Sequence, residues 1–154
     1  SFTGLRIGVA AAKGLCFALD LPLIAIPTLQ SLAAQLPIET GVTIPMLDAR
    51  RMEVYAAVYD SDLQETGPTR AEIITADSFA EWREMGPVHL LGNGAEKCRE
   101  VLTHSNFHFH AELQPSAREL GLLAATKFSA GEFEDSAYFE PFYLKDFIAL
   151  KKKP

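Results

Sequence analysis

The stretch Asp48-Ala49-Arg50-Arg51 contains one carboxylate and two guanidinium groups, and guanidinium groups bind anions. An aspartate with two arginines on a tight turn can hold a phosphate or a partner's carboxylate through paired N–H donors. The alternative is structural: the aspartate accepts hydrogen bonds from the turn amides, and the arginines are solvated. The residues alone favour the structural interpretation, because charges at turns more often serve the fold than a ligand.

A second candidate is the turn Gly92-Asn93-Gly94, which follows an apolar run at 89–91. A glycine turn between a strand and a helix can present backbone amides to a phosphate. The third glycine of the dinucleotide-binding fingerprint would fall at Lys97, so the pattern has low specificity. We interpret the stretch as a strand-to-helix turn, with a nucleotide loop at Gly92 and Gly94 as the second interpretation.

Three histidines lie close together in the sequence: His104, His108 and His110. The first two are four residues apart, a spacing that chelates a metal only on a helix. The intervening Ser-Asn pair predicts a turn, and the alternation over 107–111 predicts a strand. We therefore predict no metal site, no cofactor and no assembled catalytic residues.

The elements that must position these residues begin with a long helix at 1–18, apolar over most of its circumference. Its polar residues Arg6, Lys13 and Asp20 are seven apart and form one narrow stripe. A helix this apolar must be covered on two sides, and a partner chain could provide one cover. Small residues recur every four positions from 4 to 12, which would let another backbone approach closely.

The rest of the chain has the pattern of an α/β protein with two parts, 1–40 and 41–150, and a basic tail at 151–154. Pro45 indicates that its strand is an edge strand or begins irregularly. A buried strand is expected at 23–26, a helix capped by Thr28 at 28–36, two strands within 42–59 joined by a turn, a strand at 70–74, a helix capped by Asp77 that runs to 85, a strand at 89–91, a helix through 98–102, a strand at 107–111 and a helix through 120–128.

Composition limits the classes of function. At 154 residues and 48% hydrophobic content, the chain can bury a core. A net charge of −6 argues against a stand-alone nucleic-acid binder, which needs a concentrated positive face. Two cysteines do not suggest a disulfide framework, so a reducing, cytoplasmic compartment is expected. No secretory segment is visible, and the charges in the first helix argue against a membrane span.

Three motifs resemble those of one family. The opening residues SFTGLRIG are similar to the second half of the Gly-Pro-Gly-Ser-Phe-Thr-Gly-Leu-Arg-Ile-Gly signature of the TsaB family, also called YeaZ. The family's Asp-Ala-Arg-Arg motif and the residues after it are matched by Asp48, Arg50, Arg51, Glu53, Val54 and Tyr55. Its Pro-x-Tyr-Leu-Arg ending is matched by Pro141, Tyr143 and Leu144, with Lys145 in place of arginine. The Gly-Pro-Gly is missing before Ser1, so the resemblance implies that an amino-terminal segment of the family's first lobe is absent here.

The resemblance implies the actin-like, sugar-kinase and heat-shock-protein (ASKHA) fold, with a partial first lobe at 1–40 and a complete second lobe at 41–150. It implies a non-catalytic subunit that pairs with TsaD, and with the ATPase TsaE, so that TsaD can transfer a threonylcarbamoyl group to the adenosine beside the tRNA anticodon. A homodimer could form when TsaD is absent. The family's partner interface lies on first-lobe helices, and within the helix present here our candidates are Leu5, Ile7, Gly8, Ala11 and Leu15.

Two enzymatic alternatives remain for the same superfamily. A metallopeptidase would need a metal at His104, His108 and His110. A phosphotransferase would need Asp48 as base or magnesium ligand and a nucleotide at 92–94, together with a phosphate loop that would precede Ser1.

Overall fold

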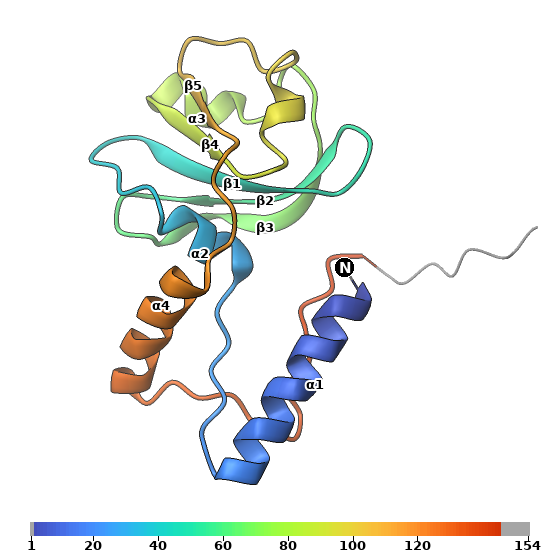
Figure 1. Cartoon of the computed structure of the whole chain (residues 1–154). Coiled ribbons are helices and arrows are strands. Elements are labelled where there is room, and N and C mark those ends of the chain that lie inside the picture. The colour runs from blue at the N-terminus through green and yellow to red at the C-terminus, as the bar shows by residue number, and fades with distance from the viewer. Residues whose placement is uncertain (1, 146–154) are drawn as a thin grey trace, which may run out of the picture. The chain divides into compact units, whose positions relative to one another are not determined.

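The computed structural model describes residues 2–145. They form two compact units, one made of the described residues up to Ala25 and from Ala125 on, the other of Ile26–Ala124. The elements are α1 (Phe2–Leu19), α2 (Thr28–Ala33), β1 (Val42–Asp48), β2 (Glu53–Tyr59), β3 (Glu65–Ile73), α3 (Ala80–Met85), β4 (Val88–Leu91), the 3-10 turn η1 (Glu96–Cys98), β5 (Phe107–His110) and α4 (Ala117–Ala130) (Figure 1). These unit boundaries differ from the predicted lobe boundary after residue 40, and the division into lobes stays a prediction.

The second unit is built on one mixed sheet with the strand order β3-β2-β1-β4-β5 (Figure 1). The strands β1, β2 and β3 pair antiparallel, whereas β4 pairs parallel with both β1 and β5. Parallel strands end at the same edge of a sheet. The β1–β2 turn and the turn after β4 therefore lie at one edge, which is where the candidate residues of this unit meet.

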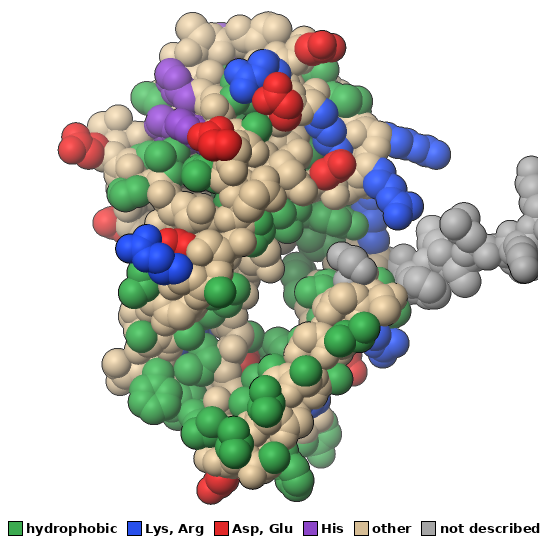
Figure 2. Space-filling model, in the orientation of Figure 1, with side chains coloured by type: hydrophobic (Ala, Val, Ile, Leu, Met, Phe, Trp, Pro, Cys, Tyr) green, Lys and Arg blue, Asp and Glu red, His purple; other side chains and the backbone are tan. Residues whose placement is uncertain are grey.

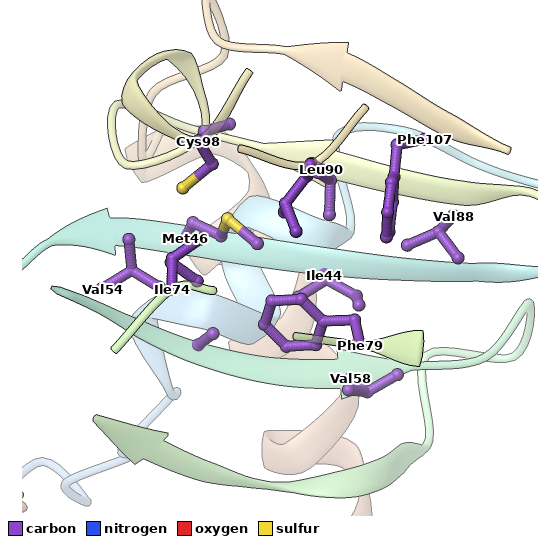
Figure 3. Close-up of a cluster of buried hydrophobic side chains, with 13 residues drawn as sticks. Ile44, Met46, Val54, Val58, Ile74, Phe79, Val88, Leu90, Cys98 and Phe107 are labelled. Atoms are coloured by element: carbon purple, nitrogen blue, oxygen red, sulfur yellow. The ribbon is translucent and has the colours of Figure 1, made fainter. Parts of the chain in front are cut away.

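One face of the sheet carries the main core. Side chains from the strands converge there with side chains from the segments that cover them (Figure 3). The buried set is Ile44, Met46, Val54, Ala56, Val58, Ile74, Phe79, Val88, Leu90, Ala95, Cys98, Leu102 and Phe107. Each large aliphatic side chain that is fully buried contributes roughly 1.5–3 kcal/mol to folding. On the opposite face, Leu29 and Ala33 of α2 pack against Ala57 and Tyr59 of β2.

The first unit consists of α1, the residues after it up to Ala25, and the described residues from Ala125 on. The Lys13 ammonium donates hydrogen bonds to the carbonyls of Ala137 and Phe139, both at 3.1 Å. The ring of Phe2 packs against that of Tyr143 at a centroid distance of 5.1 Å. The residues of two predicted family motifs, at the two ends of the chain, are therefore in direct contact.

Most predicted elements are confirmed, including the opening helix, the hairpin, and a strand rather than a helix at the histidines. The expected strand at 23–26 is wrong: Leu23 forms only an isolated bridge with Glu134. The helix through 98–102 is also wrong, because only the 3-10 turn η1 forms, and its bend places both Cys98 and Leu102 in the core. The helix expected at 28–36 ends at Ala33.

Three local details also differ from the sequence-based expectation. Pro27, not Thr28, is the amino-terminal cap of α2. Phe79, in a left-handed conformation, takes the place expected for Asp77 at the start of α3. β1 is the central strand despite Pro45, and its pairing with β2 skips from residue 43 to residue 46, so the ladder is interrupted where the proline lacks an N–H.

Candidate functional site

The β1–β2 turn is held by the aspartate that precedes it. The Arg50 N–H donates to Asp48 Oδ1 at 2.8 Å, and the Ala49 N–H donates to the Glu53 carbonyl at 3.0 Å. Arg50 and Arg51 have φ values of 70° and 51°, both in the left-handed region. Two consecutive left-handed residues cost conformational energy when neither is glycine. The aspartate's hydrogen bond offsets part of that cost.

Lys97 joins this turn to the segment after β4. Its ammonium contacts the Asp48 carboxylate and donates to the carbonyls of Arg51 at 2.7 Å and Glu53 at 2.6 Å. The Lys97 side chain is 22% exposed, so these interactions are partly shielded from water. The hydrogen bond from Lys97, followed by that from the Arg50 amide, holds the pKa of Asp48 below its usual value. The predicted ligand-binding carboxylate is thus engaged within the chain.

The sequence did not predict a role for Lys97. That residue was considered only as the position where the third glycine of the dinucleotide-binding fingerprint would fall. No spacing rule relates it to Asp48, which lies 49 positions earlier. The link exists because β4 pairs parallel with β1, so the segment after β4 begins beside the end of β1.

The turn at 92–94 is packed onto β1 by its own polar groups. Asn93 Oδ1 accepts a hydrogen bond from the Asp48 N–H at 3.0 Å. The Gly94 N–H donates to the Met46 carbonyl at 3.0 Å, and the Gly92 N–H donates to the His110 carbonyl at 3.1 Å. Both glycine amides that a phosphate would need are therefore bonded to backbone carbonyls.

Close packing explains why both positions are glycine. Gly92 has φ of 93°, and a Cβ there would lie 2.6 Å from Leu32 Cδ2 and 2.7 Å from the Met46 carbonyl oxygen. A Cβ at Gly94 would lie 3.0 Å from three atoms of Met46. The glycines let the turn approach the end of β1, and this is a structural reason for their presence.

The arginines of the turn have a different environment from the aspartate. Arg50 and Arg51 are both exposed, at the tip of the hairpin. They are the cations of this motif that an external phosphate or carboxylate can reach.

The predicted partner-binding residues of α1 all lie on its exposed surface. Leu5, Ile7, Gly8, Ala11 and Leu15 are exposed, and no described residue of this helix is buried. Ile7 is 65% exposed and Leu15 is 63% exposed. The hydrophobic side chains along α1 are visible in Figure 2. We call these five residues the α1 face.

The histidines are arranged differently from the metal site that was considered. His104 lies in the turn before β5, whereas His108 and His110 lie on β5 itself. His89 of β4, which the sequence did not single out, stacks on His108 at a centroid distance of 5.2 Å. Within residues 2–145, no group of three or more His, Cys, Asp or Glu side chains is arranged to hold a metal ion.

By length and composition alone, α1 is the one helix in the described part of the chain that could cross a membrane. Core helices of soluble proteins and signal sequences meet the same criterion. This property of α1 is weak evidence on its own.

Residues 1–153 match the model of the family described as TsaD, tRNA N6-adenosine threonylcarbamoyltransferase. The tRNA threonylcarbamoyladenosine biosynthesis protein TsaB of Escherichia coli K12 is 30% identical over 164 residues, which covers 100% of this chain and 70% of the relative. TsaB of Bacillus subtilis 168 is 32% identical over 143 residues, covering 84% and 60%. The chain belongs to the TsaB (YeaZ) family.

Solved structures agree with this assignment. YeaZ from Pseudomonas aeruginosa superposes with a TM-score of 0.72 at 26% identity, over 93% of this chain and 70% of that one. A second Pseudomonas aeruginosa structure, of an uncharacterized protein with similarity to peptidase YEAZ, gives a TM-score of 0.76 at 26% identity, over 94% and 69%. The predicted ASKHA-type α/β fold is confirmed. The chain spans about 60–70% of the length of these TsaB and YeaZ proteins.

Proposed function

We propose that this TsaB-family protein acts in the biosynthesis of threonylcarbamoyladenosine in tRNA, as a non-catalytic subunit in the cytoplasm. In this role it binds TsaD through the α1 face, and TsaD, assisted by TsaE, carries out the transfer to the adenosine beside the anticodon. Membership of the family supports the pathway. The single observation that carries the scaffold role is the exposed apolar face of α1.

Among the described residues, the α1 face is apolar and uncovered. Helices of globular proteins normally bury an apolar stripe, yet all five residues of the α1 face are exposed. A Cβ added at Gly8 or Gly14 would meet no other atom within 4 Å, so neither glycine is required by packing among residues 2–145. Each interior glycine costs a helix about 1 kcal/mol relative to alanine. Close approach of a partner's backbone would offset that cost.

The hairpin supports a structural rather than a catalytic role for its aspartate. A general base or magnesium ligand needs a carboxylate that can reach the substrate. The Asp48 carboxylate instead accepts hydrogen bonds from Lys97 and from the Arg50 amide. We infer that this network stiffens the hairpin, and that Arg50 and Arg51 contact a phosphate or a partner's carboxylate.

Binding to purified TsaD by the full-length gene product tests the proposal. Ile7→Glu places a charge on the α1 face, whereas Met85→Glu places the same charge on an apolar side chain of α3 that is 79% exposed. We expect Ile7→Glu to weaken binding at least tenfold and Met85→Glu to leave it unchanged, with the circular dichroism of both variants preserved. Wild-type affinity in Ile7→Glu would place the interface elsewhere.

A second copy of the protein is the competing occupant of the same face. Sedimentation of the full-length protein, measured without TsaD and then with TsaD, separates the two cases. We expect any homodimer to dissociate when TsaD is added and to be weakened by Ile7→Glu. A dimer that is weakened by Ile7→Glu and yet persists with TsaD bound would show that the α1 face is not the TsaD surface.

A further inference from the structure

Two half-buried histidines meet at the edge of the sheet where β4 pairs with β5. In the parallel register His89 lies opposite His108, and His110 lies two residues further along β5 on the same face. His89 Nδ1 and His110 Nε2 are 3.1 Å apart. β5 is an edge strand of only four residues, so a side-chain contact contributes much to holding it in place.

The ring geometry identifies this contact as a hydrogen bond. The two ring centroids are 5.4 Å apart while the facing nitrogens are 3.1 Å apart, so both nitrogens lie between the ring centres, near the line that joins them. Two imidazoles that share a metal ion instead converge at the angle set by its coordination geometry. One facing nitrogen must therefore carry a hydrogen and the other must accept it.

The number of protons on the pair decides whether this bond exists. A neutral pair and a singly protonated pair each retain one N–H donor facing one bare nitrogen. When both rings are protonated, two N–H groups of like charge face each other and the bond is lost. Adding the second proton therefore converts an attraction across β4 and β5 into a repulsion.

The surroundings of His89 disfavour a proton on its ring. The Glu112 carboxylate lies 4.0 Å from His110 Nδ1. Burial, followed by the neighbouring His110 and then His108, lowers the pKa of His89. Thr43 of β1 is the residue opposite His89 in the sheet, and α2, with the sequence Thr-Leu-Gln-Ser-Leu-Ala, contains no titratable side chain.

We propose that His89 and His110 form a proton-dependent latch that holds edge strand β5 on β4 near neutral pH and opens in acid. The latch also bears on the candidate site, because the His110 carbonyl accepts the Gly92 amide that anchors the 92–94 turn. The 92–94 turn also holds Asp48, because Asn93 Oδ1 accepts the Asp48 N–H. Opening the latch therefore loosens the packing of the turn beside the hairpin.

Titration of the histidine ring resonances by NMR tests the coupling. We expect the titration of His89 to depend on the presence of His110, as it does for interacting groups. His110→Gln should raise the midpoint of His89, and His104→Gln, which alters the preceding turn, should not. Independent single-step titration of both rings, with a His89 midpoint unchanged by His110→Gln, would overturn the proposal.

Hydrogen exchange of the Gly92 amide provides the structural readout. Because the folded-state pKa of His89 is lowered, the latch stabilises β5 at and above the ordinary histidine pKa and fails as the pH falls below it. Between about pH 7.5 and about pH 5.5, on either side of that pKa, we expect the protection factor of Gly92 to fall about fivefold, the value of one net hydrogen bond. In His110→Gln the fall should be clearly smaller, because burial still lowers the pKa of His89 but the bond to residue 110 is gone. An equal pH-dependent fall in that variant would refute the latch.

Discussion

Replacing Lys97 by methionine removes the charge that joins the hairpin to the segment after β4 while keeping most of the side-chain volume. Three interactions are lost: the contact with the Asp48 carboxylate and the hydrogen bonds to the carbonyls of Arg51 and Glu53. If the account of the hairpin is right, Lys97→Met destabilises the fold through these losses alone.

The magnitude follows from the exposure of each partner. A hydrogen bond to a charged group contributes about 1.5–3 kcal/mol when it is shielded, and much less when water screens it. The Asp48 side chain is 47% exposed and water can replace the lost contact, so losing its interaction with Lys97 contributes little to the destabilisation. The Glu53 carbonyl loses a partly buried donor. We expect Lys97→Met to lower the free energy of unfolding by about 2–3 kcal/mol in total.

Urea unfolding at pH 7, monitored by circular dichroism, measures the change. Arg99→Met is the matched control, because Arg99 lies two residues away and pairs with Glu96 at 3.0 Å, with the two side chains 51% and 64% exposed. Its guanidinium also lies over the ring of Phe109. We expect the control to cost about 1 kcal/mol or less. Equal effects of the two substitutions would refute the reasoning.

The same pair gives a pH dependence with a definite sign. Lys97 lowers the folded-state pKa of Asp48, so the pair stabilises the protein at pH values above the ordinary aspartate pKa of about 4. Its contribution falls as the pH drops below that value and Asp48 takes up a proton. The difference between wild type and Lys97→Met should be constant from about pH 5 to about pH 8 and shrink below about pH 4.

Three further predictions concern packing, each checked by urea unfolding. Gly92→Ala should destabilise the fold by about 2 kcal/mol or more, because φ is 93° and the new Cβ would meet Leu32 and Met46. Gly14→Ala in α1 should be neutral or stabilising, because a Cβ there meets nothing within 4 Å. Met46→Ala should cost about 2–5 kcal/mol, since Met46 is fully buried. Tyr59→Phe should be neutral or stabilising, because the buried hydroxyl has no hydrogen-bond partner in the described structure. A loss above about 1 kcal/mol in Tyr59→Phe would contradict this last prediction.

The features that the sequence predicted well depend on neighbours along the chain. The 3.6-residue pattern predicts α1, and the alternation at 53–59 predicts β2 with its tight turn. Asp48 was expected to accept hydrogen bonds from turn amides, and it accepts one from Arg50. In each case the relevant partners are within a few residues.

The features that the sequence missed depend on contacts between distant parts of the chain. Lys97 reaches the hairpin, and His89 reaches His110, only because β4 lies between β1 and β5. Lys13 was assigned to a polar stripe, yet it bonds carbonyls more than 120 positions away. Pairing between distant strands is specified by the whole core, so no local spacing rule reports it.

The most direct test of the central claim is reconstituted threonylcarbamoylation of tRNA with purified TsaD and TsaE. We predict that product forms only when TsaD is present, that the full-length form of this protein increases the rate, and that Ile7→Glu removes the increase while Met85→Glu preserves it. Product formation by this protein without TsaD, or full stimulation by Ile7→Glu, would contradict the account.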